Sequence, residues 1–185
     1  MTYSLSMFRA ALAALKSQDW REHSQVNRQD YARSYFALAA SVPLYVFCFF
    51  SLTGAQSGAS AFSLPLCVIV ATLMALTFPL VAYLIVQLMS RMDVFKPWVT
   101  LRNWAVLALL IFMTCVCGLA YIGMLSTHIA GFMTLLAYLS TLLIDIRLAQ
   151  TTADMDWTVS IFTGCTIAVA SLLVLYASLL SISGY

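Results

Sequence analysis

The sequence predicts an all-α integral membrane protein, a bundle of five transmembrane helices with an amphipathic helix at the N-terminus. Two features of the composition lead to this class. Of the 185 residues, 63% are hydrophobic and only 9% are charged. Average soluble domains are about 45–50% apolar and about 25% charged. Because so few charges cannot cover so much apolar surface in water, lipid must solvate most of the chain.

Five long apolar runs provide the third observation. They cover residues 35–53, 62–89, 104–125, 128–146 and 157–180. A helix needs about 20 residues to cross the hydrocarbon core of a bilayer, so each run is long enough to be a span. The second run contains Pro79 deep within it and is long enough to tilt or bend there. We therefore divide the chain into residues 1–34 and a transmembrane domain of residues 35–185.

The residue pattern of positions 1–34 predicts a short amphipathic helix followed by a polar linker. Large apolar residues recur at intervals of three or four, which places them on one helix face. They are Leu5, Phe8, Leu12 and Leu15, with Trp20 following at a position suited to an interface. Such a helix can lie in the headgroup layer of the membrane with its cations toward phosphate. It can equally pack against the protein's own inner face, and the sequence leaves both arrangements open.

The segment from Arg91 to Trp104 is the only charged stretch in the middle of the apolar sequence. Its cations Arg91, Lys96 and Arg102 are expected to set the topology. With a cytoplasmic N-terminus and five spans, all nine Lys and Arg residues fall inside: five in residues 1–34, three in this segment and one in the last loop. Cytoplasmic loops are enriched in Lys and Arg, so the C-terminus is predicted to lie outside.

Few residues in the spans carry chemistry of their own. Asp145 and Arg147 lie at the end of the fourth run, where they could form a functional ion pair or serve as interface anchors that end the span. In the fifth run, Ser160, Gly164 and Ala168 recur every four residues, a pattern that lets helices approach closely. This row fits packing within one chain or between two copies.

Enzymatic function is not supported by the motifs. The sequence has no Gly-rich phosphate loop, no His-rich metal set and no Ser or Cys nucleophile with a neighbouring base, so no catalytic, cofactor or metal site is predicted. The net charge of +2 does not argue for nucleic acid as a partner. Every charge is expected at or beyond the inner membrane boundary, which leaves a conducting pathway without the ionisable residues that usually mark one.

Several stretches resemble a known family. They are RSYFALAASVPLYVF at the first span, FPLVAYLIVQLMSRMDVFKPWVTLRNWA through the central segment, and the short acidic loop before the last span. Together they resemble small bacterial five-span proteins similar to the Yip (Ypt-interacting protein) domain family. The resemblance implies a cytoplasmic N-terminus, a five-helix membrane domain and no catalytic residues. It rests on positions such as Arg33, Ser34, Pro79, Asn103 and Trp104.

These observations lead to a functional hypothesis. We expect a non-enzymatic scaffold or membrane-organising protein of the bacterial inner membrane, with the lipid bilayer as its main partner. One alternative is an accessory or assembly subunit of a larger membrane complex, in which other membrane protein subunits, or a second copy of the chain, are its partners. Another is a small transporter or pore subunit for an uncharged solute.

Overall fold

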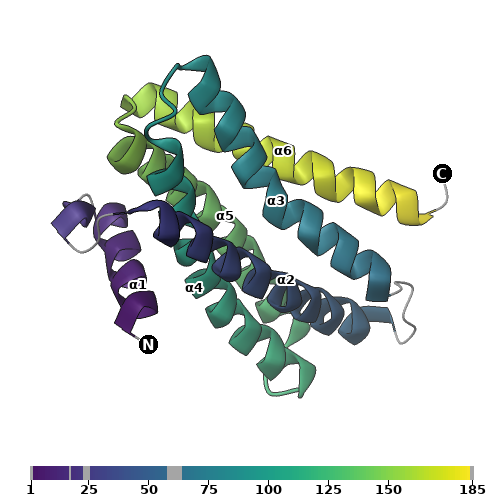
Figure 1. The fold of residues 1–185 in the computed structure, drawn as a ribbon. Coiled ribbons are helices and arrows are strands. Elements are labelled where there is room, and N and C mark those ends of the chain that lie inside the picture. The colour runs from purple at the N-terminus through teal and green to yellow at the C-terminus, as the bar shows by residue number, and fades with distance from the viewer. Residues whose placement is uncertain (1, 17, 23–25, 58–63, 184–185) are drawn as a thin grey trace.

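The computed structural model describes residues 2–16, 18–22, 26–57 and 64–183, and its regular elements there are all helices (Figure 1). The helices are α1 (Thr2–Leu15), the short 3-10 helix η1 (Trp20–Glu22), α2 (Arg28–Ser57), α3 (Leu64–Leu88), α4 (Phe95–Tyr121), α5 (Thr127–Ala153) and α6 (Trp157–Ser183). Helices α2 to α6 are long and apolar enough to cross a membrane, whereas α1 is too short. The predicted fold class is confirmed, and the chain is a multi-span membrane protein.

Several spanning helices extend beyond the apolar runs that predicted them, although α3 lies within its run and α4 ends four residues early, at Tyr121. Helix α4 begins at Phe95 rather than at residue 104, and α5 continues to Ala153 rather than ending at residue 146. The first turns of α4 are as buried as its middle, since Trp98 and Leu101 are fully buried. Pro97 is tolerated because it lies in the first helical turn, where a backbone N–H has no intrahelical partner. Hydropathy predicts the segments that lie in lipid, whereas packing against neighbouring helices lets α4 and α5 continue past those segments.

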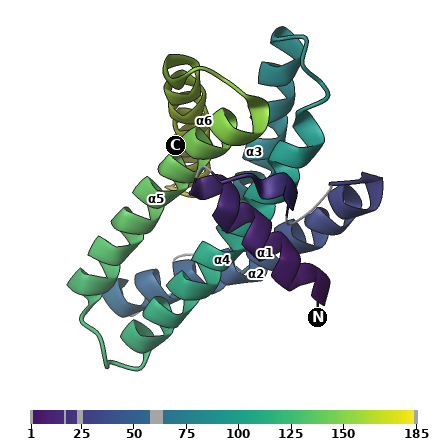
Figure 2. The same ribbon diagram turned by 90° about the vertical axis from the view of Figure 1, so that its left-hand side faces the viewer.

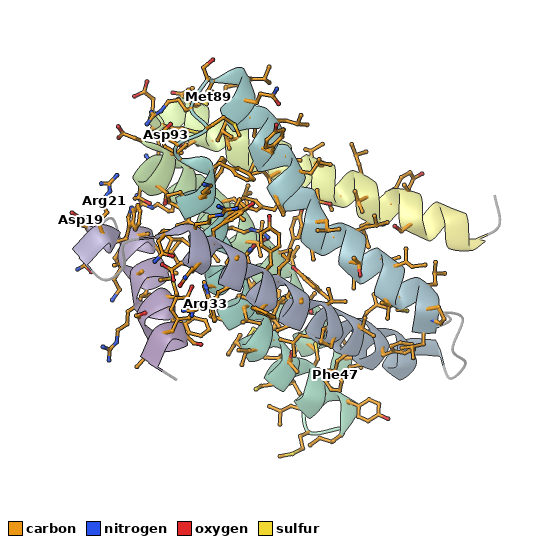
Figure 3. All side chains as sticks on the ribbon, viewed as in Figure 1. Asp19, Arg21, Arg33, Phe47, Met89 and Asp93 are labelled. Atoms are coloured by element: carbon orange, nitrogen blue, oxygen red, sulfur yellow. The ribbon has the colours of Figure 1, made fainter. Side chains whose placement is uncertain are left out.

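The charged residues gather at one end of the bundle, which we call the charged end. Helix α1, η1, the turn between α3 and α4 and the turn between α5 and α6 lie there (Figure 1). Asp19, Arg21 and Asp93 are labelled at this end in Figure 3. The opposite end holds the C-terminal end of α6 and the turn between α4 and α5, which contains no charged residue. The charge segregation expected from the sequence is thus a property of the fold.

Helix α1 packs against the bundle through small residues. Ala10, Ala11, Ala13 and Ala14 are all buried, and α1 contacts α4 and α5 (Figure 2). Alanine lets the helix axes approach closely because it has little side chain to keep them apart. Of the two arrangements that the sequence left open, the structure has α1 on the protein.

The large apolar residues of α1 point in directions that the sequence did not reveal. Leu5 and Leu12 are 54% and 52% exposed on the outer side of the helix, whereas Phe8 and Leu15 are half-buried. Trp20 in η1 is buried, and its indole Nε1 donates a hydrogen bond to the carbonyl of Thr151 at 3.3 Å. The helix therefore has a docked alanine face and a free leucine face.

The spanning helices separate toward the uncharged end. Helix α2 packs along α4, and α4 packs along α5. Helices α3 and α6 lie beside each other and diverge from α4 toward the opposite end (Figure 1). The charged end is thus the more closely packed half of the bundle.

The row of small residues on α6 faces α5 of the same chain. A Cβ atom added to Gly164 would overlap the Ile146 side chain and lie 3.4 Å from its backbone nitrogen. Ser160 is fully buried one turn earlier, and the carbonyl of Ala168 accepts a hydrogen bond from the Tyr138 hydroxyl at 3.0 Å. The close approach of α5 and α6 depends on Gly164, because any side chain there would displace Ile146.

Replacing Gly164 tests this seam. Gly164→Leu should destabilise the protein by about 1–3 kcal/mol, the usual cost of overpacking a filled interface. The thermal unfolding midpoint in detergent should fall by several degrees while the mass of the particle stays constant. Cys165→Leu is the matched control. Cys165 follows Gly164 and is exposed, so its replacement should leave the midpoint unchanged. An unchanged midpoint for Gly164→Leu would show that the seam is not closely packed.

Candidate functional site

A buried ion pair joins α4 to α5. The Nε of Arg102 donates a hydrogen bond to Oδ1 of Asp145 at 3.1 Å, and the two residues are 7% and 3% exposed. Arg102 lies seven residues after the start of α4, about 10 Å along its axis. Charged side chains inside a membrane domain are costly and almost always face the bundle interior, where they pair with one another. The pair is therefore the first candidate for a functional site.

This pairing differs from the one considered in the sequence. Asp145 was matched with Arg147, but its ionic partner is Arg102, which the sequence placed in a charged loop. Arg147 is exposed, and its Nη1 donates a hydrogen bond to Oε1 of Gln150 at 3.4 Å. Asp145 does not end its span, since α5 continues for two more turns to Ala153. The structure thus places one acid and one base inside the domain, where the sequence led us to expect neither.

A pair of aromatic residues lies on one side of the Arg102 guanidinium. Its central carbon lies 4.2 Å from the centroid of the Phe78 ring, a cation–π contact from α3. Trp98 meets the same ring edge-on, with the centroids 5.5 Å apart. Both aromatic residues are fully buried. A guanidinium is more weakly hydrated than an ammonium and stacks on aromatic rings, so Arg102 suits this buried site better than Lys would.

Two further polar contacts link helices near the pair. The amide Nδ2 of Asn103 donates to the carbonyl and the hydroxyl of Ser34 in α2, at 3.4 and 3.3 Å. The Tyr3 hydroxyl of α1 donates to the carbonyl of Asp30 at 3.3 Å. Burial, and after it the Asp30 carboxylate, raises the pKa of Tyr3 to about 12, so this hydroxyl stays a donor at neutral pH. Helices α1, α2, α4 and α5 are thus held together by polar contacts in one half of the bundle.

A cavity of about 170 Å³ begins at Arg102. Residues from all five spanning helices line it, and its wall on α4 runs from Arg102 through Val106 and Leu110 to Met113. Arg102 and Met113 are eleven positions apart, which corresponds to about 16 Å of helix. On the antiparallel α5 the wall runs from Thr141 to Thr134. The cavity is therefore polar where Arg102 lines it and apolar toward the half of the bundle in which the helices separate.

Most hydroxyls on the α5 wall already donate to backbone carbonyls. Thr134 donates to Ala130 at 2.9 Å, Thr141 to Tyr138 at 2.7 Å and Tyr138 to Ala168 at 3.0 Å. Arg102 differs: among the described residues, only Asp145 accepts a hydrogen bond from it, and through Nε alone. A guanidinium has five N–H donors. The four donors on its two Nη atoms therefore have no acceptor among the described residues, and Arg102 lines the cavity.

Metal-ligating residues do not cluster in the part of the chain that the structure describes, where no three His, Cys, Asp or Glu side chains lie close enough to hold an ion. Comparison with protein-family models, with curated proteins and with solved structures finds no match to this chain. No match therefore supports the resemblance to the Yip domain family, and the role of the site has to be inferred from its geometry.

The site could have been found by treating residues 95–104 as helix. Trp98, Leu101, Arg102 and Ala105 then share one face at intervals of three or four residues. A cation among such residues is expected to be buried and paired. The carboxylate that pairs with it lies 43 residues away, a contact that no local pattern reveals.

Variants of the pair test its energetic role. Arg102→Leu or Asp145→Leu alone should destabilise the protein by about 3–5 kcal/mol, because each leaves an unpaired buried charge. The double variant should recover most of that loss, since two apolar residues of similar size leave no charge behind. Unfolding of all four proteins in one detergent gives the coupling energy. Losses that simply add in the double variant would contradict a direct pair.

Proposed function

We propose that this chain is a non-enzymatic scaffold that organises the membrane around it, as the Yip-like sequence features suggest. In this proposal it lies in the bacterial inner membrane with its charged end in the cytoplasm. The observation that supports it most directly is the position of α1, which is docked along one half of the bundle and turns its leucine face outward.

Helix α1 reaches only part of the way along the spans. Tyr3 and Phe8 meet the Trp104 ring edge-on, with centroids 6.0 and 5.1 Å away, and Met7 packs in the same cluster as Leu107. Leu107 is twelve residues, or about 18 Å, into a 27-residue helix. The five spans cross both leaflets, whereas α1 adds volume beside their charged half alone. A half-length helix of this kind occupies area in one leaflet and can alter its packing and curvature.

The outer face of α1 is suited to lipid. Leu5 and Leu12 are exposed, and Arg9 and Lys16 project from the same side. Amphipathic helices with this pairing of leucines and cations bind at the boundary between headgroups and acyl chains. Long basic side chains can extend to the headgroups while their stems stay in apolar surroundings. Docking through alanine and lipid contact through leucine together support a membrane-organising role.

The proposed orientation follows from the charge distribution. All nine Lys and Arg residues belong to the charged end, with Arg102 buried within it. Loops rich in Lys and Arg stay in the cytoplasm. A reporter that is active only outside the cytoplasm should work when fused after Tyr185 and stay silent when inserted at Lys96. Activity at Lys96 would reverse the proposed orientation.

The scaffold proposal is tested in reconstituted vesicles. The double variant Leu5→Ser, Leu12→Ser removes the lipid-facing side chains of α1 and keeps its alanine face. Each leucine contributes roughly 1.5–3 kcal/mol of apolar burial, so the change should abolish insertion of the outer face. At equal protein-to-lipid ratios, vesicles with the native chain should differ in mean diameter from those with the variant, measured by electron cryomicroscopy.

The matched control is Leu135→Ser with Leu139→Ser. These two leucines of α5 are 55% and 45% exposed, which is close to the exposure of Leu5 and Leu12, but they lie on a helix that crosses the whole membrane. This control should give vesicles of the native diameter. Equal diameters for the native chain and the α1 variant would contradict the proposal.

A further inference from the structure

We infer that the cavity beside Arg102 binds an uncharged, lipid-soluble molecule through an acceptor oxygen, such as the carbonyl of an ester or a ketone, that receives hydrogen bonds from the Nη groups of Arg102. The inference rests on the cavity and its charges and is independent of the proposed scaffold role.

The Nη groups of Arg102 are the hydrogen-bond donors of the site. Arg102 is 7% exposed and lines the cavity, and within the described part of the chain its Nη atoms have no acceptor. Buried polar groups are costly unless they are hydrogen-bonded, so N–H groups inside a membrane domain favour a guest that carries an acceptor. A pure hydrocarbon would leave these donors unsatisfied. The ligand therefore has at least one accessible oxygen.

The charge of the site selects against an anion. Asp145 already neutralises Arg102, with 3.1 Å between the bonded atoms. Among the described residues that line the cavity, Arg102 alone is charged. A carboxylate entering beside it would add a net negative charge to a poorly solvated interior, where an ion without its own counter-ion is strongly disfavoured. An uncharged carbonyl accepts the same hydrogen bonds without this cost.

The lining and the volume of the cavity indicate the character and size of the rest of the ligand. Away from Arg102 most of the wall is apolar, with residues that include Met74, Leu109 and Met113. The volume of about 170 Å³ is close to that of cavities that take a single small apolar ring. The cavity therefore has room for the oxygen-bearing group of the ligand and the first part of its alkyl chain. The cavity is partly open, so the remainder of a longer molecule can lie outside it.

Three probes of equal chain length separate the possibilities. Methyl decanoate has an ester carbonyl and no charge, decanoate has a carboxylate, and decane has no acceptor. Binding to the full chain in nanodiscs is measured by native mass spectrometry over a range of probe concentrations. We expect one methyl decanoate per chain, bound at least tenfold more tightly than decane or decanoate. Equal affinity for ester and alkane, or tighter binding of decanoate, would overturn the inference.

Variants place the binding in this cavity. Ser171→Phe adds a ring to the wall from α6 and should weaken ester binding at least tenfold. Leu172→Phe is the matched control. Leu172 follows Ser171 and is 48% exposed, so its replacement should leave the affinity for the ester unchanged. If Ser171→Phe does not fold, Ala137→Leu fills the cavity from α5. Native affinity in a folded cavity-filling variant would overturn the assignment.

A second variant tests the donor. Arg102→Leu with Asp145→Leu removes both charges together and leaves the apolar part of the cavity. Its preference for the ester over the alkane should fall to about one, because the hydrogen bonds are lost while apolar contacts remain. An unchanged preference would show that Arg102 does not recognise the oxygen and would overturn the inference.

Discussion

The hydrogen-bonded ion pair between Arg102 and Asp145 is the constraint on which the rest of the structure depends. Lipid offers no water to an unpaired charge, so neither residue can turn away from the other without a large cost. The pair fixes α4 against α5, and the stacking of Arg102 on Phe78 brings in α3. Apolar helices alone would pack in many similar ways, because lipid competes well with helix–helix contacts. A single buried pair removes most of those alternatives.

The two halves of the bundle differ because of where this pair lies. Near it, Asn103 bonds Ser34, and Tyr3 bonds the Asp30 backbone, so α1, α2 and α4 are held as one body. Beyond it, α3 and α6 diverge from α4 and the cavity extends between the helices. Polar contacts thus cluster in the half on which α1 docks, and Arg102 also forms the polar end of the cavity.

The sequence predicted the parts of this fold that composition determines. Five spans and the gathering of charge at one end follow from hydropathy and from the positions of Lys and Arg. The partner of Asp145 did not follow, since Arg102 is distant in sequence and lies in a stretch that resembles a loop until its helical periodicity is considered. The docked face of α1 was predicted only in part, since Phe8 packs on Trp104 whereas Leu5 and Leu12 are exposed. Alanines such as Ala10 and Ala14 form much of the contact with the bundle, and a pattern of large apolar residues does not reveal them.

The most direct test of this account is a distance measured in a lipid bilayer. Solid-state NMR can detect magnetisation transfer between the Nε of Arg102 and the carboxyl carbon of Asp145. The account predicts strong transfer, because the bonded nitrogen and oxygen are 3.1 Å apart. It also predicts the chemical shift of an ionised carboxylate and loss of the signal in Asp145→Leu. A folded protein in bilayers without this transfer would contradict the central role of the pair.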